Sequence, residues 1–379
     1  MLKQLRTVAA VALLTVTTYA VAVETNATHP ETYVVKKGDT LWDIAARFLK
    51  KPWLWPEIWQ ANPQVQNPHL IYPGDVLSLA YLDRVTPQAR VEPGPRQEAP
   101  INAVPLSAIE PFLKNLNIVD SFKELPYVVS LEDGRLRASA GQHAYVRGLV
   151  GAQTGQRYMV VRPTMRYDLP KPGADLDARG DTTPLSGNLW KSYVASSDRH
   201  ELLGYELAQV NLGSVTQVAA DDSGVVSLLL EDSGREVRAG DRLVPVQAQP
   251  YDLQFIPHPP SGAALAEGQL RVLAVSDAFS AAGPRDVIAI SGGAREGIDN
   301  GTVFSIWRSG VHVNDTVTGM ASSRTDDSIK PGVGRVALPA EYAGHAMVFR
   351  TFDKVSYALV MEGTKPVRVG YEMRHPDAE

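Results

Sequence analysis

The first patterned stretch of the chain is residues 33–48, YVVKKGDTLWDIAARF, where a short apolar run passes into apolar residues at helical spacing. Gly38 supplies a turn between the two patterns, and Asp39 or Thr40 stands where a helix is capped. Leu41 and the apolar positions that follow it share one helical face. The stretch therefore predicts a strand that runs into a helix.

A second helix and a closing strand follow. Residues 55–62, WPEIWQAN, place Trp55 and Ile58 on one face, and the next proline ends the helix. A Pro-Gly pair further on turns the chain into a short apolar strand. The order predicted for residues 31–81 is strand, helix, helix, strand.

Residues 126–375 alternate apolar runs with glycine turns, a pattern typical of half-buried antiparallel strands. Several stretches of this zone occur twice in the same order. The related pairs are 139–148 with 281–292, 156–162 with 301–308, and 204–240 with 334–370. The chain is therefore predicted to be an α+β multidomain protein whose β-rich C-terminal half consists of two related antiparallel β modules, residues 126–250 and 251–379.

Each β module carries a polar, poorly patterned insertion at the same place, residues 168–200 in the first and 309–330 in the second. Long loops of this kind are either functional or without fixed structure. If they face the same direction from two related modules, they form one contact surface.

The segment between the two patterned zones is rich in proline. Spaced prolines at residues 82–105 favour extended backbone and predict a semi-rigid spacer. Residues 105–125 have apolar positions at helical spacing, which predicts a helix that docks on the next domain. Residues 82–125 are thus interpreted as a Pro-rich linker and docking helix.

The N-terminal residues 1–22 resemble a secretory signal peptide. Lys3 and Arg6 precede an apolar run that is short for a membrane span and ends in the small-residue pattern Ala-Val-Ala at 20–22. A retained N-terminal anchor is the competing interpretation. Cleavage after Ala22 predicts an exported protein.

Composition narrows the possible chemistry. The chain of 379 residues has no cysteine, which excludes disulfides, thiolate metal sites and a cysteine nucleophile, and an exported chain of this kind fits a bacterial periplasm. Lysine and arginine number 37 against 42 acidic residues, and no basic stripe stands out. This composition argues against nucleic acid as a partner.

Residues 31–81 resemble a LysM domain, the βααβ module that binds peptidoglycan and chitin. The positions that carry the resemblance are Tyr33, Val35, Gly38-Asp39-Thr40-Leu41, Ile44-Ala45, Asn62 and Ile71-Tyr72-Pro73-Gly74-Asp75-Val76-Leu77. The resemblance implies a glycan groove between the loop after the first strand and the loop before the second. The implied glycan-binding residues are Gly38, Asp39, Thr40, Leu41, Pro68, His69, Leu70 and Ile71.

The chemistry of this groove suits N-acetylglucosamine. Loop backbone can match the amide donor and acceptor of each N-acetyl group, while its methyl group rests on apolar side chains such as Leu41 and Ile71. Asp39 and Thr40 either contact the glycan or cap the helix. His69 is interpreted as a loop histidine without a chemical role.

Four of the six tryptophans lie between residues 42 and 59. A domain this small needs large side chains to fill its core, so Trp55 and Ile58 are assigned to the core. Trp42 falls between core positions and is expected to point partly outward. Trp42 and Trp53 contact glycan, protein or neither.

Three short sequences resemble known functional motifs, but none of them indicates a functional site. HELLG at 200–204 has glycine where the second histidine of a zinc-binding helix must stand. RGD at 179–181 is three common loop residues, and SGGAREG at 291–297 has the wrong glycine spacing for a dinucleotide loop. We therefore expect no enzyme activity, no metal site and no cofactor.

The whole arrangement, a signal peptide, a LysM domain, a Pro-rich spacer and a β-rich half, resembles the type IV pilus secretin-associated protein family, whose C-terminal half is similar to that of the flagellar assembly protein T. The resemblance implies a periplasmic tether that binds peptidoglycan and an outer-membrane secretin ring. A ring-like homo-oligomer around this partner is part of the same expectation. A wall-bound scaffold of another secretion or flagellar machine is the alternative, and a peptidoglycan hydrolase is a further one.

Overall fold

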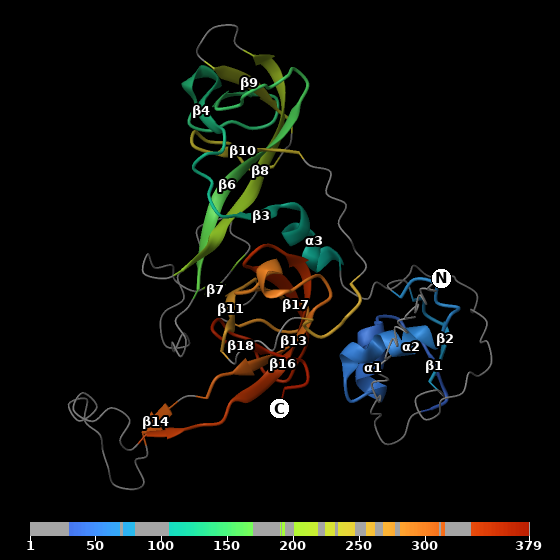
Figure 1. Ribbon diagram of the computed structural model, residues 1–379. Helices are drawn as coiled ribbons and strands as arrows, with labels where there is room; N and C mark the ends of the chain where they lie inside the picture. Colours follow the sequence, from blue (N-terminus) through green and yellow to red (C-terminus); the bar gives the residue numbers. More distant parts are fainter. Residues whose placement is uncertain are drawn as a thin grey trace, which may run out of the picture.

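The computed structural model describes most of the chain beyond residue 29 (Figure 1). The described residues are 30–68, 71–79, 106–169, 190, 192–193, 201–218, 224–231, 234–246, 255–261, 268–276, 281–310, 312–314 and 335–378. The predicted signal peptide and the Pro-rich spacer at 82–105 lie outside them.

The N-terminal domain has the predicted order of strand, helix, helix and strand. Its elements are β1 (Thr32–Val34), α1 (Leu41–Phe48), the 3₁₀ helix η1 (Pro52–Leu54), α2 (Trp55–Gln60) and β2 (Val76–Ser78). The two strands pair antiparallel, with Tyr33 opposite Leu77. Trp55 and Ile58 are buried, so their assignment to the core is confirmed.

The segment predicted as one docking helix has two parts. The helix α3 (Leu106–Lys114) buries Ile109, Phe112 and Leu113, and the chain then forms the strand β3 (Leu116–Val119). Strand β3 pairs antiparallel with β8 (Leu202–Val218) of the first β module. The helix is thus shorter than the helical spacing predicted, because sheet pairing claims the residues after Lys114.

The first β module is a closed six-stranded barrel, called barrel 1 below. Its strands are β4 (Tyr127–Leu131), β5 (His143–Arg147), β6 (Arg157–Asp168), β8, β9 (Val225–Leu230) and β10 (Arg242–Pro245), and the short helix η3 (Glu132–Gly134) follows β4. The order around the barrel is β4-β5-β9-β8-β6-β10, and β10 returns to β4. The strands β6 and β8 are long and extend beyond the barrel toward the second module (Figure 1).

The second β module, called barrel 2, repeats this topology. Its strands are β11 (Leu270–Val275), β12 (Val287–Ile290), β13 (Val303–Arg308), β16 (Glu341–Thr351), β17 (Ser356–Gly363) and β18 (Glu372–Arg374), with the short helix η4 (Ala294–Glu296) after β12. The order around the barrel is β11-β12-β17-β16-β13-β18, and β18 returns to β11. The first strand therefore pairs with the second and sixth in both barrels, as the repeated sequence pattern predicted for two related modules.

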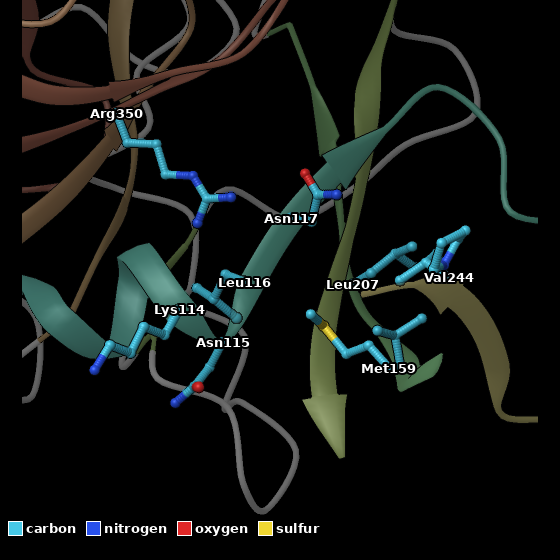
Figure 2. A pocket seen from close by; sticks show the side chains of 10 residues that line it. Lys114, Asn115, Leu116, Asn117, Met159, Leu207, Val244 and Arg350 are labelled. Carbon is cyan, nitrogen blue, oxygen red and sulfur yellow. The ribbon is translucent and has the colours of Figure 1, made fainter. Parts of the chain in front are cut away.

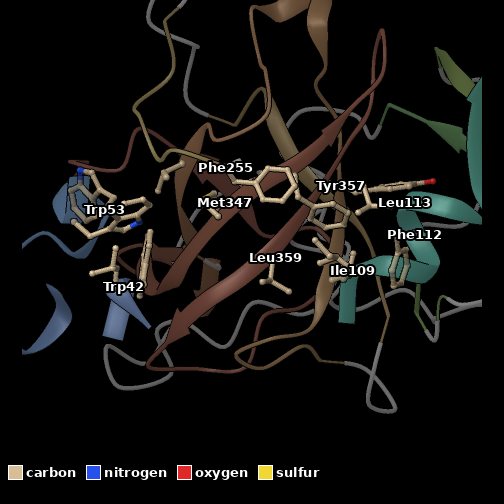
Figure 3. Packing of buried hydrophobic residues seen from close by; sticks show 14 of the residues in the cluster. Trp42, Trp53, Ile109, Phe112, Leu113, Phe255, Met347, Tyr357 and Leu359 are labelled. Carbon is tan, nitrogen blue, oxygen red and sulfur yellow. The ribbon is translucent and has the colours of Figure 1, made fainter. Parts of the chain in front are cut away.

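Strands of barrel 2 are apolar on both faces. In β12 and β17, alternate residues belong to two different clusters: Ile288 and Ala358 fill the barrel, whereas Val287 and Leu359 face outward. The outer face is covered by the N-terminal domain on one side and by α3 on the other (Figure 3). Burial on both faces explains why these strands read as continuous apolar runs instead of alternating ones.

The described parts of the two insertions take different paths. In the first insertion, β7 (Ser192–Tyr193) pairs with β11 and so adds a strand to barrel 2. The second insertion contains β14 (His312–Asn314), which pairs with β15 (Arg335–Ala337) just beyond it to form a two-stranded ribbon that projects from barrel 2 (Figure 1). The expectation that both insertions contribute to one surface is therefore wrong for these parts.

Within the described residues, every helix is too short or too polar to cross a bilayer.

Candidate functional site

Two loops of the N-terminal domain are joined by backbone hydrogen bonds. The amide of Val35 donates to the carbonyl of Asp75 at 2.8 Å, and the amide of Gly74 donates to the carbonyl of Val35 at 2.8 Å. Gly38 and Gly74 have φ angles of +90° and +92°, a region that favours glycine. The two turns thus fix the loop after β1 beside the loop before β2.

The carboxylate of Asp39 organises the first of these loops. It accepts hydrogen bonds from the Tyr33 hydroxyl at 2.7 Å, the Lys36 amide at 2.8 Å and the Arg47 guanidinium at 2.9 Å. Arg47 also donates to the Tyr33 hydroxyl. Asp39 is 4% exposed. The side chain therefore shapes the loop from within, a role that the sequence pattern did not distinguish from glycan contact or helix capping.

The surroundings of Asp39 lower the pKa of its carboxyl. Burial alone would raise this pKa, but the hydrogen bonds from the Lys36 amide and the Tyr33 hydroxyl, together with the charge of Arg47, outweigh burial. A carboxyl whose folded pKa lies below its unfolded value stabilises the fold above the unfolded pKa. This contribution is lost as the pH falls through the folded pKa.

We predict that Asp39→Asn lowers the stability of the N-terminal domain by about 1.5–3 kcal/mol at neutral pH, since hydrogen bonds to a charged acceptor contribute about this much. The variant should also lose less stability than the native chain between neutral and acidic pH. Tryptophan fluorescence during denaturant unfolding reports on this domain because it holds four of the six tryptophans. The exposed Glu31→Gln is the control, and equal unfolding of both variants would contradict the prediction.

Thr40 caps α1. Its hydroxyl accepts a hydrogen bond from the Asp43 amide at 3.1 Å, and the Asp43 carboxylate accepts one from the Thr40 amide at 3.1 Å. This reciprocal arrangement is a capping box. Of the two roles considered for Thr40, the structure shows the capping role.

Asn62 joins α2 to β2. Its side-chain amide donates to the carbonyls of Ile58 at 2.7 Å and Ser78 at 3.0 Å, and its side-chain oxygen accepts from the Ser78 amide at 2.7 Å. Asn62 is fully buried. An asparagine at the end of a helix thus aligns the closing strand with the helices.

Four of the predicted site residues have buried side chains: Asp39, Leu41, Pro68 and Ile71. Leu41 is 1% exposed and Ile71 is 0% exposed, so neither presents apolar surface to a sugar. The expectation that their side chains support the N-acetyl group is therefore corrected: both belong to the core. His69 and Leu70 lie outside the described residues.

Gly38 is exposed, like Lys36 and Lys37 in the same loop, and its backbone is available to a ligand. The structure thus presents two joined, glycine-containing turns with backbone at the surface. Residues 33–80 match the LysM domain. This family binds glycans that contain N-acetylglucosamine, such as peptidoglycan and chitin. The N-terminal domain is therefore a glycan-binding module. Apart from the buried side chains of Leu41 and Ile71, the glycan contacts of the predicted groove residues stay a prediction.

A curated relative shares a short segment with this chain. The protein YqbP of Bacillus subtilis (strain 168), described as uncharacterized, is 40% identical over 60 residues, which cover 13% of this chain and 27% of YqbP. The chain thus spans about a quarter of the length of this relative. The similarity is confined to a short segment and gives no information about the barrels.

Trp42 and Trp53 of the LysM domain contact barrel 2. The rings of Trp42 and Trp53 lie 6.5 Å and 4.5 Å from the ring of His345 in β16. The Lys51 ammonium pairs with the Asp377 carboxylate at 2.7 Å beside them. Trp42 is 2% exposed, so the expectation that it points partly outward is wrong. Of the roles left open for these tryptophans, the structure shows contact with protein.

Glu206 lies where the two barrels meet. Its buried carboxylate accepts hydrogen bonds from the hydroxyls of Thr164 at 2.8 Å, Tyr167 at 2.8 Å and Tyr357 at 2.9 Å, and from the indole of Trp190 at 2.6 Å. Thr164, Tyr167 and Glu206 belong to barrel 1, whereas Tyr357 belongs to barrel 2. This carboxylate thus joins both barrels and the first insertion.

A cleft of about 210 Å³ opens beside this junction (Figure 2). Its cationic residues are Lys114 and Arg350, and its apolar lining includes Met159 and Leu207. The Arg350 guanidinium donates to the carbonyls at the end of α3, those of Phe112 and Leu113, both at 2.6 Å. Lys114 pairs with Glu110 of the same helix. Arg350 therefore holds the end of α3 on barrel 2, whereas the ion pair of Lys114 lies within the helix.

The described residues contain no group of three potential metal-ligating side chains. The Leu-Leu-Gly of HELLG lies at the start of strand β8, not on a helix, and His200 is outside the described residues. The HELLG stretch therefore lacks the helical frame on which a zinc-binding H-E-x-x-H motif depends.

Proposed function

We propose that this protein is a periplasmic peptidoglycan-binding protein that anchors an outer-membrane secretin complex of the type IV pilus to the cell wall. The observation that carries the proposal is the LysM domain with its two joined loops at the surface. The resemblance of residues 1–22 to a signal peptide supports export to the compartment that contains the wall.

The β-rich half is the proposed partner-binding end of the anchor. The Glu206 hydrogen bonds and the packing of α3 on barrel 2 connect its two barrels. Connected barrels suit an anchor because a pull on the partner is then passed to the LysM domain. A single LysM domain binds weakly, but several chains around one ring would engage the wall together and gain avidity.

We propose that the protein is a binder without enzyme activity. A wall hydrolase attached to a LysM domain is the competing possibility, and a scaffold for another secretion or flagellar machine is another. Identification of the membrane protein that co-purifies with the chain distinguishes the two scaffold roles.

We predict that the full chain sediments with purified peptidoglycan and that Gly38→Gln weakens this binding about tenfold, a loss of about 1.4 kcal/mol, since a long side chain blocks the approach to the loop backbone. Gly141→Gln in barrel 1 is the matched control. Gly141 also has a positive φ, +82°, and at both glycines an added Cβ has no neighbour within 4 Å.

Two outcomes would contradict the proposal. Equal sedimentation of the native chain and both variants would place the glycan site away from the loop of Gly38. The chain could also sediment with peptidoglycan while no secretin co-purifies with it from cells that have assembled pili. That result would support wall binding and contradict the pilus role.

A further inference from the structure

The two glycine turns of the LysM domain, residues 36–39 and 72–75, have the same construction. The amide of Asp39 donates to the carbonyl of Lys36 at 3.1 Å, and the amide of Asp75 donates to the carbonyl of Tyr72 at 3.0 Å. In each turn the aspartate carboxylate accepts a hydrogen bond from the first amide, at 2.8 Å and 3.1 Å. The glycine in third place has a positive φ in both, as in a type II turn. Both backbones are therefore held in place from within.

The surfaces of the two turns differ in chemistry. Lys36, Lys37 and Gly38 of the first turn are exposed, so two lysine side chains stand beside open backbone. At the corresponding places the second turn has Tyr72 and Pro73, which are partly exposed and present apolar surface. Backbone hydrogen bonds join the two turns. The joined turns therefore offer positive charge beside apolar surface.

The carboxylates near the first turn leave this positive charge in place. Asp39 is buried and pairs with Arg47 at 2.9 Å, so these two charges compensate each other. Asp75 is 7% exposed, and its carboxylate faces its own turn. Among the residues that the structure describes, no carboxylate pairs with the Lys36 ammonium. A carboxylate supplied by a ligand would therefore meet a cation at this turn.

Barrel 2 leaves the first turn accessible. Its contact with the LysM domain covers Trp42 of α1 and Trp53 of η1, whereas both lysines of the turn stay exposed in the full chain. The Gly38 amide donates to no acceptor within the described part of the chain. A ligand at the turn can thus accept hydrogen bonds from the backbone and from an ammonium group together.

We propose that this turn selects glycans that carry carboxylates, with Lys36 and Lys37 binding the carboxylates and the turn backbone binding the sugar. The peptide stems of peptidoglycan supply such groups, whereas chitin is an uncharged polymer of N-acetylglucosamine. The inference rests on the wall binding proposed above and adds the class of glycan. Exposed charges contribute selectivity more than affinity, because exposed ion pairs are weak and are screened by salt.

Sedimentation of the full chain with two polymers tests the selection. The first polymer is purified peptidoglycan, and the second is the same material after a carbodiimide and ethanolamine have converted its carboxylates to neutral amides. We expect the native chain to bind the first about fivefold more tightly than the second, the scale of two exposed ion pairs. Added salt should remove the difference, because it screens exposed charges.

Charge variants assign the preference to the turn. Lys36→Gln with Lys37→Gln should lower binding to native peptidoglycan about fivefold and leave binding to the amidated polymer unchanged. Lys36→Arg with Lys37→Arg keeps both charges and should keep the preference. Lys50→Gln with Lys123→Gln is the matched control, since both lysines are exposed and lie outside the two turns. Circular dichroism and tryptophan fluorescence check that each variant is folded.

The outcomes separate the selection from wall binding itself. Equal binding of the native chain to both polymers would overturn the selection and leave glycan binding intact. A preference that persists in the glutamine variant of the turn, or disappears in the control, would also overturn it. A native chain that sediments with neither polymer would contradict wall binding, and the selection with it.

Discussion

Replacing Glu206 with alanine is expected to destabilise the β-rich half more than any single surface substitution. Four donors lose their common acceptor, and three of them, those of Tyr167, Trp190 and Tyr357, belong to fully buried or nearly buried side chains. Each buried donor left without a partner costs roughly 1–3 kcal/mol, and the sum is less than additive because all share one acceptor. The denaturant midpoint of the full chain measures the loss.

A matched control separates this effect from the loss of a carboxylate as such. Glu236 of barrel 1 pairs with Arg137 at the surface, and its side chain is 52% exposed. Glu236→Ala should therefore change stability by about 0–1 kcal/mol. Tyr357→Phe removes the hydrogen bond that Tyr357 of barrel 2 donates to Glu206 and should have an intermediate effect. A midpoint for Glu206→Ala equal to that of Glu236→Ala would show that the carboxylate does not hold the junction.

The electrostatics of the junction agree with a buried acceptor. The pKa of the Tyr357 hydroxyl is raised well above its ordinary value, first because the group is buried and then because Glu206 lies beside it. The pKa of Tyr167 is raised for the same reasons. Both hydroxyls therefore keep their protons and remain donors to Glu206 across the range of pH in which proteins are stable.

The sequence predicted the architecture because the architecture repeats. Paired stretches such as 156–162 with 301–308 lie in β6 and β13, the third strands of the two barrels. Glycine turns and apolar alternation are local signals, so they identify strands and their order. They do not show which surfaces meet. Nothing in the pattern around Glu206 indicated that a carboxylate would join the two barrels.

The same limit applies to the tryptophans. Trp55 lies at a core position of α2 by helical spacing, and the structure buries it there. Trp42 is buried by His345, a residue about 300 positions away in the sequence, and no local pattern carries that information. The two-residue strand β7 is likewise too short to have a period, although it joins the first insertion to barrel 2.

Helix α3 shows how a partly correct prediction fails at a boundary. Ile109, Phe112 and Leu113 are apolar at helical spacing and are buried. After Lys114 the apolar residues continue, but their partner is now β8, with Leu116 opposite Ala208. Arg350 of barrel 2 donates to the last carbonyls of the helix and so stabilises its end. The end of α3 is therefore set by the pairing of β3 with β8 and by the hydrogen bonds from Arg350, both of which involve residues distant in the sequence.

Replacing Leu41 and Ile71 together with aspartate is expected to unfold the LysM domain. Both side chains are in its core, at 1% and 0% exposure. A carboxylate buried there must either become protonated or disrupt the packing. Substitutions of this kind belong to the class that costs on the order of 4 kcal/mol or more. Peptidoglycan binding should disappear as a consequence of unfolding, whereas the glycan contacts that the sequence predicted for Leu41 and Ile71 would imply loss of binding in a folded domain.

Two variants distinguish these explanations. In Leu41→Asp with Ile71→Asp, tryptophan fluorescence and circular dichroism should show an unfolded domain together with lost sedimentation. In Gly38→Gln the same measurements should show a folded domain that binds weakly, because this position is at the surface and an added Cβ has no neighbour within 4 Å; the positive φ strains the new side chain, as it does in the Gly141→Gln control. A folded double variant that fails to bind would restore both apolar side chains as glycan contacts. That outcome would also mean that the loops open in solution, since neither side chain reaches the surface in the closed arrangement.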